Sequence, residues 1–251
     1  AKTSKKTSVP IEPGAQARCA EVLAWVERNS RRAWREGMTR FGIEADKAVG
    51  MSVAKLRAKA KEYRRDHALA LELWKSAVPE ARMLATFVDD PREVTPAQME
   101  RWCRDFDNWG LCDAACYGLF DRTPHVFTKA EAWAQRVAEF EKRAAFALLA
   151  GAAQHRKDLP DEPFFAALAW IEAAAIDERN FVKKGVSWAL RGLGQRGPAL
   201  RAEVVKLAQR LADSKSLSAR WIGKDALRDL NSATALRRLA RQSDKPPTRK
   251  A

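Results

Sequence analysis

An indole, a carboxylate and a phenol recur at intervals of four residues in Trp109, Asp113 and Tyr117. On an α-helix, which turns by about 100° per residue, these side chains lie at about 0°, 40° and 80° and form one stripe, while neighbouring apolar residues face the other way. A carboxylate beside an indole can stabilise a developing positive charge. The alternative reading is that Asp113 only balances the positive N-terminus of its helix. If Asp107 or Asn108 caps that helix, Asp113 lies beyond the first turn, where this effect fades.

A second stripe falls within residues 180–193. On a helix, the apolar residues of this segment fill one half of the circumference, and Lys183, Lys184 and Arg191 lie across from them. Trp188 sits at the seam between the two halves. Basic side chains beside an exposed aromatic suit the backbone of a nucleic acid, so these three cations are expected nucleic-acid contacts. The alternative is a tryptophan that packs at an interface under the stems of basic residues.

Both stripes require helices, and the rest of the chain is patterned in the same way. Apolar residues recur at three and four positions almost throughout, whereas the alternating patterns of strands are missing. We expect about a dozen short helices. Their starts are marked by Ser52, by capping boxes at Thr95 and Thr128, and by Gly197 before Pro198.

The predicted helices fall into pairs with short connections, and the pairs recur about every 35 to 45 residues. This pattern predicts an all-α protein, an α-solenoid of HEAT-like antiparallel helix pairs whose concave basic surface holds an extended ligand. A compact helical bundle is the structural alternative. We expect a single helical-repeat domain over residues 11–241, with flexible basic tails at residues 1–10 and 242–251.

The positive charge is concentrated in the C-terminal third of the chain. The sequence has 46 Lys and Arg against 32 Asp and Glu, which gives a net charge of +14. Residues 11–177 are nearly neutral, whereas residues 178–232 carry 12 basic and 5 acidic side chains. A folded segment with this excess favours a polyanionic partner.

Several other chemistries are weak or excluded. The glycines of residues 192–197 match a dinucleotide-binding pattern, but a predicted helix precedes them where that pattern needs a strand. We expect them to accept positive φ at the end of a helix, with Arg196 in this turn as a further phosphate contact. The four cysteines lack the spacing of a zinc site, so we expect no metal and reduced thiols in the cytoplasm. The longest uncharged stretch, residues 144–155, is too short to cross a bilayer.

Several short segments carry a family resemblance together, although none does so alone. They are Phe41-Gly42-Ile43, Leu73-Trp74 with residues 80–85, residues 108–113, residues 143–146, and residues 177–184 running on to 188–191. Through them, roughly residues 30–235 resemble the bacterial DNA alkylation repair glycosylases of the AlkD type, which are built from HEAT-like repeats. An α-solenoid is therefore expected from the resemblance as well as from the helical pattern.

The resemblance implies excision of N3- and N7-alkylated purines from double-stranded DNA, with the lesion approached through its deoxyribose and not drawn into a deep base pocket. It implies a catalytic cleft formed by Trp109, Asp113 and Trp188, and it matches Arg143 to a position that contacts the DNA backbone. Trp34 is the nearest candidate for an aromatic residue that the family places upstream. We expect a bacterial, cytoplasmic monomer that associates with the nucleoid when bound to DNA, needs no cofactor and has no membrane partner.

The implied reaction needs only one carboxylate. Ordinary glycoside hydrolysis uses two, because the leaving oxygen must be protonated. An N3- or N7-alkylated purine is already cationic and leaves as a neutral base, so a single Asp113 near the sugar is sufficient. Two other functions remain open: a HEAT-like protein that binds branched or distorted DNA without hydrolysis, and an α-solenoid scaffold for an acidic protein.

Overall fold

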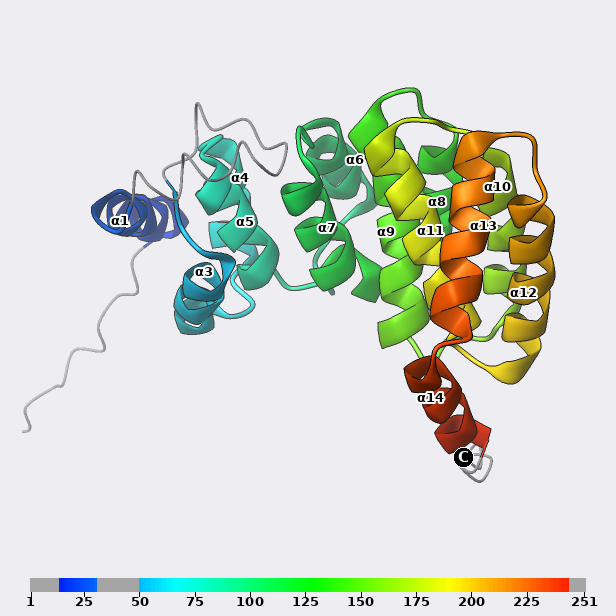
Figure 1. Ribbon diagram of the computed structural model, residues 1–251. Coiled ribbons are helices and arrows are strands. Elements are labelled where there is room, and N and C mark those ends of the chain that lie inside the picture. Colours follow the sequence, from blue (N-terminus) through cyan, green and yellow to red (C-terminus); the bar gives the residue numbers. More distant parts are fainter. Residues whose placement is uncertain (1–13, 31–49, 244–251) are drawn as a thin grey trace, which may run out of the picture. The chain divides into compact units, whose positions relative to one another are not determined.

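The computed structural model describes residues 14–30 and 50–243 of the chain. All regular structure in these two ranges is helical, so the all-α class is confirmed (Figure 1). The elements are α1 (Ala15–Arg28), α3 (Val53–Ala60), η2 (Lys61–Tyr63), α4 (His67–Lys75), α5 (Pro79–Val88), α6 (Pro96–Arg104), α7 (Trp109–Gly118), η3 (Phe120–Arg122), α8 (Val126–Ala134), α9 (Glu139–His155), α10 (Glu162–Ala174), α11 (Asn180–Gly194), α12 (Pro198–Ala212), α13 (Leu217–Leu230) and α14 (Ala233–Ser243).

Three of the four predicted helix starts are confirmed. The Ser52 side chain accepts a hydrogen bond from the backbone N–H three residues on, at the start of α3. Thr95 does the same at the start of α6. Gly197 is the residue before α12, and Pro198 is its first residue, where a missing N–H costs nothing.

The fourth predicted start, at Thr128, is wrong. Helix α8 begins at Val126, so Thr128 lies inside it. The reason is a turn just upstream, in which the Thr123 hydroxyl accepts the N–H of His125 at 3.3 Å. This turn directs the chain into the helix before Thr128 is reached.

The described helices group into two compact units. Unit 1 contains α1, α3, η2, α4 and α5, in which α1 packs on α4 and α3 packs on α5. Asp66 accepts the Leu69 N–H at 3.0 Å and thereby caps α4, and it also forms an ion pair with Arg18 of α1 at 2.8 Å. The buried Glu80 of α5 accepts the N–H of Gly50 at 2.8 Å. Two carboxylates thus tie the parts of this unit together.

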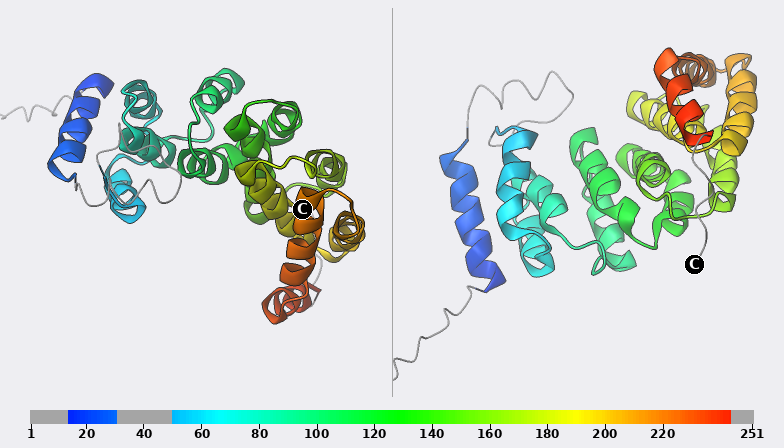
Figure 2. Two further views of the ribbon diagram at one scale, coloured as in Figure 1. Left: turned by 45° about the horizontal axis from the view of Figure 1, so that its top comes forward. Right: turned by 90° about the horizontal axis from the view of Figure 1, so that it is seen from below.

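Unit 2 contains α6 to α14 and has two layers of helices from α7 to α13. In the front layer, α7, α9, α11 and α13 lie side by side, and each contacts the next (Figures 1 and 2). In the back layer, α10 contacts both α8 and α12. Each back-layer helix also packs on the next helix of the front layer: α8 on α9, α10 on α11, and α12 on α13. The pairs begin at Val126, Glu162 and Pro198, 36 residues apart. The HEAT-like repeat is therefore confirmed with the expected spacing.

Helix α9 is the centre of unit 2. It contacts α7, α8 and α11, and residues 143–153 are all buried. Most of these residues are alanines, so neighbouring backbones come close to its axis. A Cβ placed on Gly192 of α11 would lie only 3.4 Å from the Cα of Ala150. This close packing fixes the relative positions of α9 and α11, and with them the residues that they carry.

The glycines near the end of α11 serve packing. A Cβ on Gly194 would come within 2.7 Å of the Leu230 side chain. The prediction that these glycines accept positive φ is wrong, because Gly197 is extended with a φ of −173°. Among the described glycines, only Gly50 has positive φ. The end of α11 therefore needs small residues for close packing, and none of these glycines serves a left-handed turn.

The predicted tails lie outside the described residues, apart from positions 242 and 243 at the end of α14. The domain boundaries at 11 and 241 remain a prediction. No helix among the described residues is long and apolar enough to span a membrane. Cys19, Cys103, Cys112 and Cys116 are all free and buried, as expected for small core residues.

Candidate active site

Asp113 is positioned by a capped helix. The side chain of Asn108 accepts the N–H of Leu111 at 3.0 Å and caps α7. Trp109 is then the first residue of the helix and Asp113 the fifth. Asp113 therefore lies beyond the first turn, and balancing the helix N-terminus does not account for its carboxylate.

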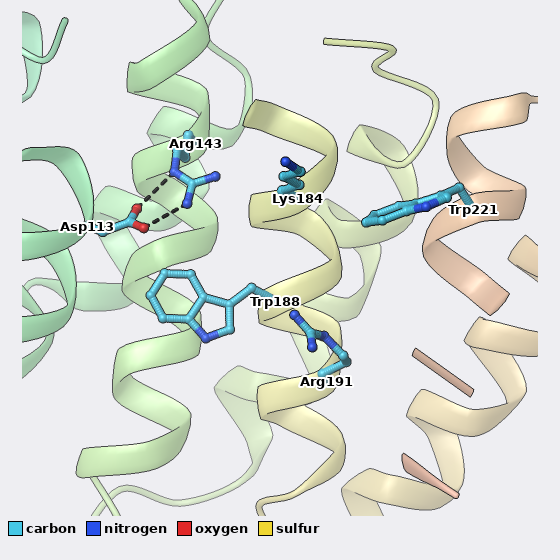
Figure 3. A pocket seen from close by; sticks show the side chains of 6 residues that line it. All are labelled: Asp113, Arg143, Lys184, Trp188, Arg191 and Trp221. Atoms are coloured by element: carbon cyan, nitrogen blue, oxygen red, sulfur yellow. Dashed lines mark hydrogen bonds and ion pairs between the residues drawn. The ribbon is translucent and has the colours of Figure 1, made fainter. Parts of the chain in front are cut away.

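The carboxylate of Asp113 is held by Arg143 of α9 in a two-point ion pair (Figure 3). Arg143 Nε donates to Oδ1 at 2.8 Å, and Nη2 donates to Oδ2 at 2.7 Å. Nη1 donates to the carbonyl oxygen of Phe181, at the start of α11, at 2.7 Å. One buried guanidinium thus links three helices of the front layer and fixes the plane of the carboxylate.

The surroundings of Asp113 push its pKa in two directions. Burial raises the pKa of the Asp113 carboxyl above its usual value, and the hydrogen bonds and positive charge of Arg143 oppose that rise. Burial lowers the pKa of Arg143, but Asp113 and the neighbouring thiols raise it, and the net pKa lies above the usual value, so Arg143 stays charged. The ionised carboxylate therefore depends on its arginine partner.

A pocket of about 360 Å³ opens beside this ion pair. Figure 3 shows Asp113 and Arg143 on one side, Trp221 on the other, and side chains of α11 between them. Every lining residue comes from the front layer, so the solenoid repeat is what brings them together. The lining residues are Asp113 on α7, Arg143 on α9, Lys184, Trp188 and Arg191 on α11, and Trp221 on α13.

Trp188 is supported by aromatic neighbours. Its ring lies 5.1 Å from that of Tyr117 on α7, at an interplanar angle of 34°. Tyr117 in turn meets His155 edge to face at 4.5 Å. His155 is held by the buried Asp121, whose Oδ2 lies 2.5 Å from the imidazole Nδ1. Tyr117, at the end of the predicted stripe, therefore packs against Trp188.

The structure brings most of the predicted site residues together. Asp113, Trp188, Arg143, Lys184 and Arg191 line one pocket, although they are far apart in sequence. Arg191 also interacts with two acidic side chains of α13 at 3.6 and 3.8 Å, which leaves its guanidinium partly neutralised. Lys184 is exposed. The roles of these residues in catalysis and DNA binding remain proposals.

Three other predicted residues are placed differently. Trp109 is partly exposed one turn before Asp113 but is not among the pocket-lining side chains. Lys183 lies beside the pocket, with its ammonium 5.2 Å from the centre of the Trp221 ring. Trp34 lies outside the described residues.

Arg196 has a structural environment. Its side chain is 4% exposed and forms an ion pair with Asp161 at 2.6 Å. Its guanidinium also donates to the carbonyl oxygens of Arg156, at 2.9 Å, and Leu159, and it lies 4.0 Å from the centre of the Phe164 ring. This arrangement closes the loop before α10 onto the end of α11. The geometry disfavours the expected contact between Arg196 and a phosphate.

Trp221 is the lining residue that sequence reasoning missed. The available signal was its position in the basic segment, directly after Arg220 and three residues before Lys224. What could not be read from the sequence is that α13 packs beside α11 and brings this indole to the same pocket as Asp113.

Comparison with known proteins agrees with the fold. A family model described as DNA alkylation repair enzyme matches residues 22–230. A solved structure, described as "a new family of proteins related to the HEAT-like repeat DNA glycosylases with affinity for branched DNA structures", superposes with a TM-score of 0.68 at 15% sequence identity. The match covers 83% of this chain and 94% of that one, and at this identity it shows a shared fold. No curated protein matches the chain.

Proposed function

Because the chain belongs to the DNA alkylation repair enzyme family, we propose that it is a DNA glycosylase that hydrolyses the N-glycosidic bond of N3- and N7-alkylated purines in duplex DNA. One observation carries the proposal: the Asp113 carboxylate and the Trp188 indole line the same pocket as the cations Lys184 and Arg191. A surface that binds a polyanion gains nothing from a carboxylate in its centre unless the carboxylate has a chemical task.

The task proposed for Asp113 is to stabilise a cationic sugar. Water adds its oxygen to C1′ while the bond from C1′ to the base nitrogen breaks, and the base leaves with the bonding electrons as a neutral alkylpurine. Positive charge moves onto the deoxyribose in the transition state, where a fixed carboxylate is most effective. The water proton passes to Asp113 or to solvent.

Arg143 makes this carboxylate ready for the reaction. Each carboxylate oxygen accepts one hydrogen bond from Arg143 and keeps a further lone pair for water or the sugar. We assign Arg143 chiefly to positioning, since its three described hydrogen bonds all stay within the protein. Two of its five N–H donors remain, which is compatible with an additional contact to a DNA phosphate.

The indoles are proposed to support the same charge. Trp188 lines the pocket, and Trp109 lies one helical turn from Asp113 on the same face of α7. An aromatic face near a cation contributes about 0.5 to 2 kcal/mol, and the rings also exclude water. Lys184, Arg191 and Lys183 are proposed to bind phosphates and hold the duplex over the pocket.

A second candidate function is binding without hydrolysis. The structural neighbour is described as having affinity for branched DNA, and the basic residues of α11 and α13 suit such a ligand equally well. The Asp113 carboxylate in the pocket favours the glycosylase, because binding a polyanion alone does not call for a negative charge among the cations.

The two candidates are separated by assaying freed bases. The protein is incubated with a methylated duplex and with the same duplex unmodified, and the soluble fraction is analysed for 3-methyladenine and 7-methylguanine. We expect release from the methylated duplex only. Tight binding of a four-way junction with no release from either duplex would favour the second candidate.

A further inference from the structure

Trp221 is a large apolar side chain exposed at a functional site. It is 40% exposed, whereas every other aromatic side chain in the described part of unit 2 is buried or half-buried. Its ring lines the pocket on the side opposite Asp113 (Figure 3). The hydrolysis derived above uses Asp113, Trp188 and Trp109 and gives Trp221 no task. What sets this exposed indole apart from a single apolar side chain on a surface is its place in a pocket wall that also carries cations.

The helix that carries Trp221 is rigidly held. Ser218 donates to the carbonyl oxygen of Asp177 at 2.7 Å, which ties the start of α13 to the segment before α11. Ser187 of α11 donates to Asp225 of α13 at 2.7 Å, and both side chains are buried. On the other side, a Cβ on Gly223 would come within 2.3 Å of a backbone nitrogen of α12. The indole is therefore presented by a fixed helix and does not depend on a mobile loop.

The charges around Trp221 select the kind of ligand. The Lys183 ammonium lies 5.2 Å from the centre of the ring, and Lys184 and Arg191 line the same pocket. Lys183 itself does not line the pocket, whereas the Trp221 ring does. A flat aromatic surface among cations fits a planar base attached to a phosphate backbone. The pocket volume of about 360 Å³ lies in the range of small-ligand sites.

We propose that Trp221 is a stacking platform for an unpaired nucleobase of the bound DNA. Within a duplex both faces of each base are covered by its neighbours, so an indole on a helix can only stack on a base that has left the helical stack. The inference rests on the proposed function only in taking DNA as the ligand, and it does not require hydrolysis. It adds a preference for a bulged or displaced nucleotide beside the site.

The test is a binding comparison on DNA without alkylation. Affinities are measured for a perfect duplex and for the same duplex with a one-nucleotide bulge, using the wild type, Trp221→Ala and Trp221→Phe. We expect the wild type to prefer the bulge, and Trp221→Ala to lose about 10-fold in affinity for the bulged duplex while binding the perfect duplex as before. Trp221→Phe keeps an aromatic face and should retain most of the preference. Leu217→Ala is the matched control, because Leu217 is 72% exposed on the same helix but does not line the pocket.

A spectroscopic signal reports the stacking itself. With 2-aminopurine as the bulged base, binding of the wild type should quench its fluorescence, and binding of Trp221→Ala at saturation should not. The proposal is overturned if Trp221→Ala keeps the bulge preference, or if it weakens both duplexes equally. Thermal unfolding of each variant checks the fold. If the protein releases no base from methylated DNA, the proposed glycosylase activity is wrong. The comparison of bulged and perfect duplexes still tests the role of Trp221, because it does not depend on hydrolysis.

Discussion

Arg143 and Asp113 meet across helices α9 and α7 through two hydrogen bonds of 2.8 and 2.7 Å, and both side chains are largely removed from solvent. Removing one partner of such a pair leaves the other charge buried and uncompensated, which costs about 3 to 5 kcal/mol. The pair therefore couples the chemistry of the site to the packing of the front layer.

The pH dependence of base release should follow this pair. Burial raises the pKa of Asp113 and Arg143 opposes the rise, so Arg143→Met should raise that pKa further. Because the reaction uses the carboxylate, we expect the acidic limb of the rate profile to move to higher pH and the rate at pH 7 to fall about tenfold or more. Arg143→Lys keeps a charge and should move the limb less. Single-turnover rates between pH 5 and 9, measured at a temperature where the variants are folded, check this. An acidic limb that stays in place in Arg143→Met would show that Asp113 does not set it.

A second buried carboxyl should govern stability at mildly acidic pH. Burial raises the pKa of Asp121 to about 6, against the opposing hydrogen bond of His155, and its side chain is fully buried. A raised pKa means that the native state holds a proton that the unfolded state has lost, so the stability from the protonated form is lost as pH rises from about 4 to 6. Asp121→Asn does not titrate. The difference in free energy of unfolding, Asp121→Asn minus wild type, should therefore become more positive by up to about 3 kcal/mol as the pH rises from about 4 to 6.

Only the slope of that difference between pH 4 and 6 is informative, since a constant offset also reflects packing against Gly151. Urea unfolding at several pH values measures the slope. If the difference in unfolding free energy between Asp121→Asn and wild type does not change with pH, Asp121 has the same pKa in the native and unfolded states.

Gly185 of α11 is a position where an added methyl group should help. A Cβ there would lie 3.4 Å from Arg143 Cγ and 3.6 Å from Phe146 Cβ, which is ordinary contact. Gly185→Ala should therefore raise the free energy of unfolding by about 0.5 to 1 kcal/mol through helix propensity. Gly223→Ala is the contrasting variant, because its Cβ would lie 2.3 Å from backbone, and it should destabilise by about 1 to 3 kcal/mol or more. Chemical denaturation compares the two, and a destabilised Gly185→Ala would contradict the packing described for α9 and α11.

The salt dependence of DNA binding should identify the cations that bind phosphates. Removing a cation that neutralises one phosphate lowers the slope of log affinity against log salt by about 0.9. We expect this change for Lys184→Ala and for Arg191→Ala. Lys206→Ala is the matched control, since Lys206 is exposed on α12 of the back layer and should leave the slope unchanged. Arg196→Met should also leave the slope unchanged while lowering the melting temperature. Equal slopes in Lys184→Ala and Lys206→Ala would show that Lys184 does not contact a phosphate.

The parts of the fold that depend on local sequence could be predicted. Side-chain caps such as Ser52, Thr95 and Asn108 act over three residues, and the apolar spacing fixes which face of each helix is buried. Thr128 shows the limit of this reasoning, because a Thr-x-x-Glu pattern also fits inside a helix. The turn at Thr123, not the pattern, determines where α8 begins.

The arrangement of the site depends on packing between helices and could be predicted only in part. The family resemblance grouped Asp113 with Trp188, but the intervening ion pair with Arg143 and the approach of Trp221 follow from how α7, α9, α11 and α13 pack. The same limit explains Arg196. Its basic side chain looked available for phosphate, yet the loop before α10 folds over it and supplies Asp161 and two carbonyl oxygens.

The most direct test of the proposed chemistry is base release by Asp113→Asn. Asparagine keeps the shape of the side chain and an oxygen that can accept from Arg143, but it carries no negative charge. With methylated duplex in single-turnover conditions, we predict a loss of about 100-fold or more in the rate of 3-methyladenine release, with affinity for the duplex unchanged within about twofold. A rate within a few-fold of wild type, from a variant that is folded and binds DNA, would contradict the catalytic role of Asp113.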